Sequence, residues 1–417
     1  MKSKLSITYY PTPTKNNNMK SKSVIIISAM ALAGASFAQA QTTINITGAT
    51  AFRTAAHNAI LASLTNAANG AGGAPRRASA DITLTGGTSA SNLRIYRGFI
   101  GANEYIIRAT FSGSTQGIQD LADQNSIPFL KDSSITYATT GLGSFSATAT
   151  QAANCENAAP TMAFSDVEKT LSARPTASLG GGPVGVVPFM FVMGKGAPAG
   201  MTNMTDQIHE VLWSLGQADS RLINGVTGTT VLATGRNNGS GTRATILSET
   251  GYGSFRNVIQ FNATAAGAIS EFATNGGHTS NSGVSGVLGI DRSLLTFEGT
   301  AVNAVFAGYL TISDAVTLTG YNETTGASTP GNAVPMTYNG VRYSVANVRN
   351  GSYTLWGYQQ LYTKSSLTTL ELAFDTTLRA AIPTSLTADT GIAINTMNVT
   401  RSNGDGGVVA PSTINTP

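Results

Sequence analysis

Glycine, hydroxyl and arginine residues are concentrated in residues 232–243, where Arg236 is followed by Ser240, Gly241 and Thr242. A β-branched run precedes this stretch and a helix-like segment follows it. Such a turn leaves unpaired N–H groups at a helix start, where negative charge is favoured. The arginine fork matches tetrahedral oxyanions, and the hydroxyls add donors. The stretch therefore predicts an oxyanion site; the alternative is an ordinary Gly/Ser turn beside a solvated arginine.

Two other turns have the same character. Residues 47–53 and 111–117 each join a predicted strand to a predicted helix, and both are rich in glycine and hydroxyl side chains. A short apolar run ends in a carboxylate at Asp166. Three donor-rich helix starts and one carboxylate together favour the oxyanion site over the ordinary turn.

In this order, the motifs resemble those of the phosphate-binding proteins of ABC importers. The spacing R-x-x-G-S-G-T, from Arg236 to Thr242, is the most specific motif of that family and is intact here. The similarity covers most of residues 45–380, at the level of motifs. It implies an α/β, two-lobed type II periplasmic-binding fold, in which each lobe is a mixed, largely parallel sheet flanked by helices. The lobes would close over a dehydrated oxyanion in the cleft between them.

The resemblance also implies the ligand contacts. Thr50 and the N–H of Ala51 would hold the anion from the first helix, although Ala51 is an extra residue and leaves open which amide points inward. Ser114 would donate from the second helix. Asp166 would accept the ligand's own proton; the alternative is that it caps the segment that follows it. The far side would be closed by Arg236, Ser240, Gly241 and Thr242.

This chain departs from the family pattern in two further respects. Asn238 stands where many relatives carry an aspartate that steadies the arginine, so Arg236 is expected to be held less firmly. The gaps between the turns are longer than in ordinary relatives, which predicts insertions at 67–103 and 118–160.

Hydrophobic periodicity predicts the elements that position these turns. A helix with Thr50 as its N-cap would bury Phe52, Ala56, Ile60 and Leu64. Alternating strands and helices predict a largely parallel sheet, with ligands beyond the strand ends at helix starts. Pro188 is expected to break the ladder of its strand. Strands are predicted at 43–46, 93–100, 104–111, 184–193, 302–312 and 356–363; helices at 52–66, after 115, at 208–215, 244–249, 263–272 and from 367; loops at 69–80 and 275–286, and a hairpin around 141–143.

The N-terminus predicts a secreted or periplasmic protein. A basic segment after Met19, an apolar run and a small-residue signal ending at Ala40 are typical of a signal peptide, whether translation starts at Met1 or Met19. The leader, 1–40, holds five of the 25 basic residues and no acidic one, so 20 basic and 21 acidic residues remain, a net charge of −1. Nucleic acid and anionic membranes are therefore not expected partners.

The resemblance divides the remaining chain into two lobes and a tail. Lobe one would comprise 41–194 plus 354–402, and lobe two 195–353. Residues 403–417 would form a mobile tail. The expected partners are phosphate or a related oxyanion and the ABC permease of the inner membrane, with the protein acting as a monomer.

Two other functions compete with solute binding. The low charged content, 11%, and the long polar insertions fit a secreted adhesive or matrix protein that keeps the fold without transport. A hydrolase would use Ser114 or Ser240 as nucleophile, but none of the three histidines lies in a recognisable motif. No cofactor, metal or catalytic residue is expected. His209 is predicted to be a packing or surface residue, and Cys155 a partly buried or inert thiol.

Overall fold

The computed structural model describes residues 41–66, 76–80, 92–137, 143–145, 150–387, 390–402 and 404–412. The predicted signal peptide, with its cleavage point after Ala40, lies outside this part of the chain, as does most of the loop predicted at 69–80. Residues 76–80 form a strand instead of continuing that loop. Among the helices of the described ranges, none combines the length and hydrophobicity needed to cross a lipid bilayer.

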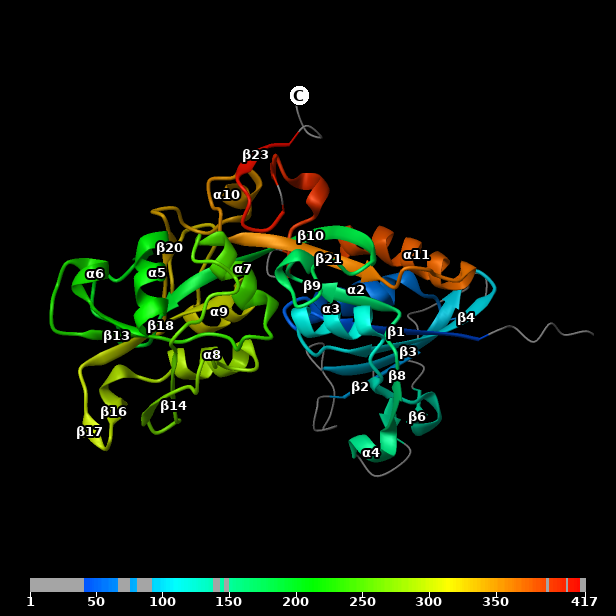
Figure 1. The fold of residues 1–417 in the computed structure, drawn as a ribbon, viewed down its shortest axis with the longest axis horizontal. Helices are drawn as coiled ribbons and strands as arrows, with labels where there is room; N and C mark the ends of the chain where they lie inside the picture. Colours follow the sequence, from blue (N-terminus) through cyan, green and yellow to red (C-terminus); the bar gives the residue numbers. More distant parts are fainter. Residues whose placement is uncertain are drawn as a thin grey trace, which may run out of the picture. The chain divides into compact units, whose positions relative to one another are not determined.

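One eleven-stranded mixed sheet organises the described residues (Figure 1). Its strands, in spatial order, are β12 (Gln217–Asp219), β13 (Thr230–Ala233), β18 (Ala304–Thr311), β10 (Gly180–Met193), β21 (Trp356–Thr363), β9 (Met162–Ser165), β1 (Thr42–Gly48), β4 (Asn103–Thr110), β3 (Leu93–Ile100) and β2 (Arg76–Ala80), with β19 (Val334–Pro335) paired to β10. The α/β class is confirmed. The expected predominance of parallel pairing is wrong, because β1 with β4, β1 with β9 and β13 with β18 are parallel and the other pairs of this sheet are antiparallel.

Strand β10 joins two halves of the sheet. Its residues up to Pro188 pair with β21, and those from Phe189 onward pair with β18. Pro188 lacks an N–H and lies where the partner changes, so it interrupts no ladder; the irregularity falls between Pro183 and Gly185 instead. Figure 1 shows β10 and β21 running side by side through the middle of this sheet. We call β18, β13 and β12 the second half, and β21, β9, β1, β4, β3 and β2 the first half.

Helices follow several strands and pack on the sheet. The predicted apolar face Phe52, Ala56, Ile60 and Leu64 is buried, which confirms the amphipathic pattern. The C-terminal helix α11 begins with a capping box between Thr368 and Glu371 and packs against α2. The helices are α2 (Arg53–Ser63), α3 (Ser114–Asp123), α4 (Gln151–Asn154), α5 (Asp206–Leu215), α6 (Arg221–Asn224), α7 (Gly241–Glu249), α8 (Asn281–Leu288), α9 (Ile312–Thr319), α10 (Val345–Arg349) and α11 (Thr369–Ser385).

Short two-stranded ribbons decorate this frame. The ribbon of β6 and β7 confirms the predicted hairpin around 141–143, whose tip lies partly outside the described residues. The ribbons are β5 (Ile127–Leu130) with β8 (Cys155–Ala158), β6 (Ile135–Thr136) with β7 (Ser144–Phe145), β11 (Asn203–Met204) with β20 (Thr337–Tyr338), β14 (Phe261–Ala263) with β15 (Ile269–Glu271), β16 (Thr296–Phe297) with β17 (Thr300–Ala301), and β22 (Val399–Arg401) with β23 (Val409–Pro411).

Three local predictions are wrong. The helix expected at 263–272 is the hairpin of β14 and β15, because Gly267 adopts a positive φ of 89° and its N–H bonds to the Thr264 carbonyl in a turn. The loop expected at 275–286 contains the start of α8, where the Ser280 hydroxyl accepts the Gly283 N–H at 3.3 Å. Residues 404–412, expected within a mobile tail, pair through β23 and bury Asp405.

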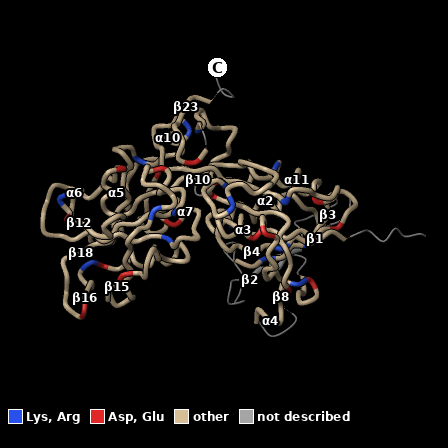
Figure 2. Tube along the Cα trace, viewed as in Figure 1, with Lys and Arg blue, Asp and Glu red and all other residues tan. Residues whose placement is uncertain are grey.

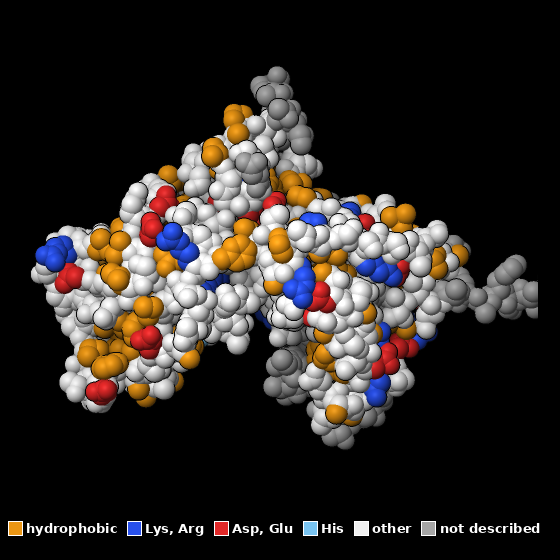
Figure 3. All heavy atoms as spheres, in the orientation of Figure 1, with side chains coloured by type: hydrophobic (Ala, Val, Ile, Leu, Met, Phe, Trp, Pro, Cys, Tyr) orange, Lys and Arg blue, Asp and Glu red, His pale blue; other side chains and the backbone are white. Residues whose placement is uncertain are grey.

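Charged side chains are sparse and scattered. Figure 2 shows lysines, arginines and acids spread singly or in small groups along the trace. On the face drawn in Figure 3, positive and negative side chains lie singly or beside each other rather than in one extended patch of one sign. This distribution agrees with the near-zero net charge expected once the basic leader is set aside.

Candidate anion site

The topology explains why the three donor-rich turns converge. Strands β1 and β4 are parallel neighbours, so the turns that follow them leave the sheet at the same edge. The Gly113 N–H bonds to the Gly48 carbonyl at 2.9 Å and joins these two turns. The turn after β13, from the second half, meets them where the Thr115 hydroxyl donates to the Gly239 carbonyl at 2.5 Å. Each turn is short and begins a helix.

Asp166 is the centre of a buried polar cluster at this meeting point. Its carboxylate accepts the Ser114 hydroxyl and, at 3.1 Å, the Thr242 hydroxyl, while its carbonyl accepts Thr245 at 2.7 Å. Gly241 fits against this cluster so closely that a Cβ there would lie 2.0 Å from Asp166 Oδ1. Four of the residues predicted for the site, Ser114, Asp166, Gly241 and Thr242, are therefore in direct contact.

Asp166 does not cap a helix, so that alternative is wrong. The short 3₁₀ helix η3 (Lys169–Leu171) has Glu168 as its N-cap residue and no side-chain cap. The N–H of Val167 bonds to Ser165 rather than to Asp166. The carboxylate of Asp166 faces only the cluster that the α3 and α7 starts form.

Arg236 is buried beside this cluster and firmly held. Its Nη1 donates to Asn281 Oδ1 at 3.0 Å, its Nη2 to the Thr279 carbonyl at 3.0 Å, and its Nε to the His278 carbonyl at 3.3 Å. Asn238 is exposed instead. The expectation of a loosely held arginine is therefore wrong, because the start of α8 takes the place of the missing aspartate.

Burial and opposite charge set the protonation of the site. Burial raises the pKa of Asp166 to about 6, an effect that the positive charge of Arg236 and the Thr242 hydroxyl partly offset. Burial likewise lowers the pKa of Arg236, and the charge of Asp166 opposes that shift. The pKa of His278 is lowered to about 4 by burial and by Arg236, so this imidazole is neutral at physiological pH and adds no second positive charge.

Ser240 and Arg243 support the turn. The Ser240 hydroxyl accepts the Arg243 N–H at 3.3 Å and is the N-cap of α7. Arg243 is buried and donates to the carbonyls of Asn275, at 2.9 Å, and Arg236, at 3.4 Å. Because Ser240 caps a helix and Ser114 contacts Asp166, neither serine forms the Ser–His pair that the hydrolase alternative requires.

Thr50 and Ala51 line a separate cavity of about 130 Å³. Thr50 is not the predicted N-cap: the N-cap residue of α2 is Phe52, and no side chain caps that helix. Asn281 lines the same cavity and bonds to Arg236, so the cavity adjoins the buried cluster. Sequence patterns did not single out Arg53, Asn281 or Asp314, which also line it; the only signal was the position of Arg53 at the end of a donor-rich turn.

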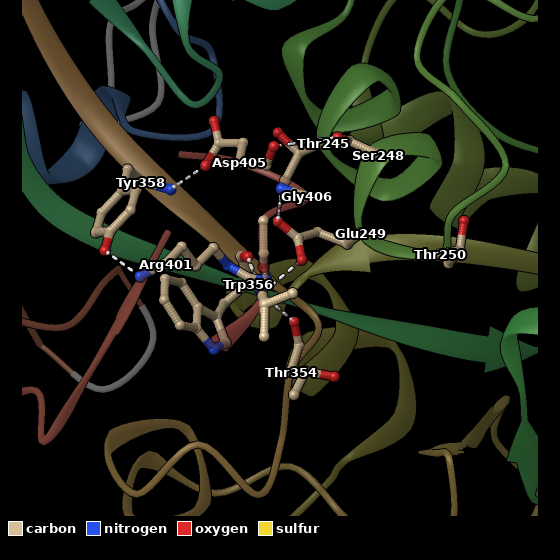
Figure 4. Close-up of polar contacts among 12 residues, drawn as sticks. Thr245, Ser248, Glu249, Thr250, Thr354, Trp356, Tyr358, Arg401, Asp405 and Gly406 are labelled. Carbon is tan, nitrogen blue, oxygen red and sulfur yellow. Dashed lines mark hydrogen bonds and ion pairs between the residues drawn. The ribbon is translucent and has the colours of Figure 1, made fainter. Parts of the chain in front are cut away.

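The C-terminal residues tie α7 to the first half of the sheet (Figure 4). Glu249, the last residue of α7, pairs with Arg401 at 2.5 Å, and both side chains are almost fully buried. The Arg401 guanidinium lies 4.1 Å from the centre of the Trp356 ring in β21. The Asp405 carboxylate accepts the N–H groups of Tyr358, at 2.8 Å, and Glu168, at 2.9 Å. The helix that carries Gly241 and Thr242 is thus fixed at both ends.

The remaining reactive residues have structural surroundings. His209 stacks on Trp213 with ring centres 4.5 Å apart, and burial lowers its pKa to about 3, which confirms a packing role. Cys155 is half-buried, and burial raises the pKa of its thiol. Within the described ranges, no three histidine, cysteine or acidic side chains are grouped so as to hold a metal ion.

Comparison with solved structures finds similar chains at low sequence identity, among them the following three. An ABC-type phosphate transport receptor from Vibrio cholerae is 13% identical, with 81% of this chain and 94% of that chain covered and a TM-score of 0.45. A human phosphate-binding apolipoprotein is 14% identical, covering 84% and 91%, with a TM-score of 0.42. PstS from Borrelia burgdorferi is 12% identical, covering 80% and 91%, with a TM-score of 0.37. No protein-family model matches the chain, and no curated protein sequence matches it.

Proposed function

We propose that the protein is a solute-binding protein that captures phosphate, or a similar protonated oxyanion, between the two halves of its sheet. The observation that carries this proposal is a buried carboxylate, Asp166, that accepts the hydroxyls of Ser114 and Thr242 while a buried guanidinium, Arg236, lies near enough for its charge to act on it. Donors that surround one carboxylate suit an anion that keeps a proton, because the carboxylate can accept that proton's hydrogen bond.

Binding requires the halves to separate and close again. The close fit of Gly241 on Asp166 leaves no room for an ion between them. An entering oxyanion would accept hydrogen bonds from the hydroxyls of Ser114 and Thr242 in place of Asp166, and from the N–H groups of Arg236 that have no partner among the described residues. The residues proposed to contact it are Ser114, Asp166, Arg236, Ser240, Gly241 and Thr242, together with Thr50 and Ala51 at the border with the adjoining cavity, which they also line. The proposed moving bodies are the two lobes, 41–194 plus 354–402 and 195–353.

The proposed setting is outside the cytoplasmic membrane, with delivery of the oxyanion to an ABC permease by a monomeric, non-enzymatic protein. The signal-peptide pattern of residues 19–40 and the resemblance of the site motifs support this setting. The adhesive or matrix alternative predicts the same secretion but no bound oxyanion.

Calorimetric titration tests the proposal directly. Residues 41–417 would be titrated separately with phosphate, arsenate and sulfate near neutral pH. We expect saturable binding of phosphate and arsenate, with sulfate bound more weakly. If none of the three ions binds, the transport proposal fails and the matrix alternative is favoured.

The preference for phosphate over sulfate should depend on Asp166 and on pH. Sulfate carries no proton near neutral pH, so an ionised Asp166 meets it with like charge in a dehydrated site. Asp166 is ionised above its pKa of about 6 and neutral below it. The ratio of phosphate to sulfate affinity should therefore fall at least about tenfold between about pH 8 and about pH 5.

The Asp166→Asn variant should weaken phosphate binding, reject sulfate less and show a ratio that hardly varies with pH. Titration of both ions at both pH values measures this, and the melting temperature reports separately on folding. A variant with a lower melting temperature but an unchanged, pH-dependent ratio would show that Asp166 serves only the fold.

A further inference from the structure

The cavity beside Arg236 is lined almost entirely by polar side chains from three helix starts. Its volume is about 130 Å³, several times the roughly 30 Å³ that a water molecule occupies in the liquid. The α2 start comes from the first half of the structure, and the α8 and α9 starts from the segment between β13 and β19. The lining residues are Thr50, Ala51, Arg53, Thr54, Ser280, Asn281, Ser282, Thr311, Ser313 and Asp314.

Arg53 is the cation of this cavity, and its hydrogen bonds are incomplete. Its Nη1 contacts Asn92 Oδ1, but its Nε is buried without a hydrogen-bond partner among the described residues. Burial lowers the pKa of Arg53, the charge of Asp314 opposes that shift, and the charge of Arg236 adds to it. A buried N–H without a partner is costly, so an acceptor that enters the cavity would be favoured.

The other groups do not neutralise this cation within a close pair. Asp314 accepts the Thr311 hydroxyl at 2.7 Å, and no ion pair within 4.0 Å joins it to Arg53 in the described part of the chain. The first turn of α2 contains no acidic residue and has no side-chain cap. The lining thus combines one arginine and many hydroxyls with one carboxylate, as the Asp166 cluster does.

Arg236 connects the cavity to the Asp166 cluster. Its Nη1 bonds to Asn281, which lines the cavity, and its charge acts on both Asp166 and Arg53. Resting on the function proposed above, we propose that the cavity is a second anion subsite, in which Arg53 binds a further anionic group of the same ligand. The ligand class is then a molecule with two linked anionic groups, such as a condensed phosphate. An apolar substituent fits this polar lining poorly.

The test compares pyrophosphate with phosphate by calorimetric titration of residues 41–417. The wild-type protein should bind pyrophosphate at least about tenfold more tightly than phosphate, because Arg53 adds charge-assisted hydrogen bonds. Arg53→Gln should lower pyrophosphate affinity by about ten- to a hundredfold and phosphate affinity by a much smaller factor. Arg256→Gln removes the same charge from an exposed site and should change neither affinity.

The outcomes separate this inference from the proposed function. If phosphate binds and pyrophosphate binds no more tightly, the second subsite is excluded while the phosphate site stands. The same holds if Arg53→Gln lowers both affinities by an equal factor at an unchanged melting temperature. If pyrophosphate binds and phosphate does not, the subsite is supported and the protein is not a phosphate receptor. If neither ion binds, both proposals fail.

Discussion

Replacing Arg236 with glutamine is expected to lower phosphate affinity by about a hundredfold to ten-thousandfold. A guanidinium has five N–H donors, and the protein engages three of them, through Asn281, Thr279 and His278. The remaining two N–H groups have no partner among the described residues and are available to an oxyanion. Each charge-assisted hydrogen bond contributes about 1.5–3 kcal/mol, although two such bonds need not add.

The absolute affinity sets what this loss looks like in a titration. Phosphate has five heavy atoms, and a ceiling near −1.5 kcal/mol per atom gives about −7.5 kcal/mol, or roughly micromolar binding. The Arg236→Gln variant should therefore bind with a dissociation constant between about 0.1 mM and about 10 mM. Arg236→Lys keeps the charge but not the planar fork, so its affinity should lie between those of the other two proteins.

The control for this experiment must be an exposed arginine. Arg256 is exposed and lies against the Tyr252 ring, so Arg256→Gln should leave phosphate affinity unchanged. Arg243 is unsuitable despite its place in the motif, because it is buried and holds the carbonyls of Arg236 and Asn275. Equal losses in the Arg236 and Arg256 variants, with both folded by circular dichroism, would show that the site is misassigned.

Local sequence patterns predicted the elements that carry their own signals. The strands β3, β4 and β21 form as expected, with most successive residues buried, and the apolar face of α2 forms because burial of one face sets the helical period. The segment 263–272 failed because its alanines favour a helix, whereas a single positive-φ glycine, Gly267, favours a turn. The pairing of β14 with β15 shows that the turn at Gly267 prevails over the helix preference of the alanines.

The site was predictable where one motif supplies several groups. The R-x-x-G-S-G-T motif and Asp166 were predicted together, and the structure brings Asp166, Gly241 and Thr242 into contact. Asn281 and Asp314 carry no motif, since the starts of α8 and α9 reach Arg53 only through the topology of the sheet. The residues on either side of Asn281 and Asp314 in the sequence therefore do not indicate that these two line a cavity.

The C-terminal segment shows the same limit. Asp405 lies in a Gly-rich stretch that is typical of a mobile end. Its carboxylate instead accepts N–H groups from Tyr358 and Glu168, far away in sequence, and burial raises its pKa to about 7. A buried acid whose partners are backbone groups of distant segments leaves no pattern in composition or periodicity.

This segment leads to the other large effect, on the free energy of unfolding. Arg401→Met should destabilise the protein by about 3–5 kcal/mol, because it leaves the buried Glu249 without its partner. Arg401 also donates to the carbonyls of Thr354, at 2.6 Å, and Trp356, at 3.1 Å, which then lose a hydrogen bond. Glu249→Gln combined with Arg401→Met should recover part of the loss, since no buried charge remains unpaired.

The destabilisation caused by Arg401→Met should grow with pH. Burial raises the pKa of Glu249 well above its ordinary value, and the charge of Arg401 opposes that rise. Without Arg401 the folded-state pKa rises further, so the variant keeps the proton of Glu249 to a higher pH than the wild type does, and its deficit in stability grows as pH rises from the folded-state pKa of the wild type towards that of the variant. Urea denaturation at about pH 5 and about pH 8 should therefore show the larger deficit in the free energy of unfolding at the higher pH.

The matched control is Arg174→Met. This substitution breaks an ion pair of the same 2.5 Å length between more exposed side chains, and it should leave the midpoint of urea denaturation unchanged. If Arg401→Met costs no more than Arg174→Met, the buried pair does not hold α7 to the first half of the sheet.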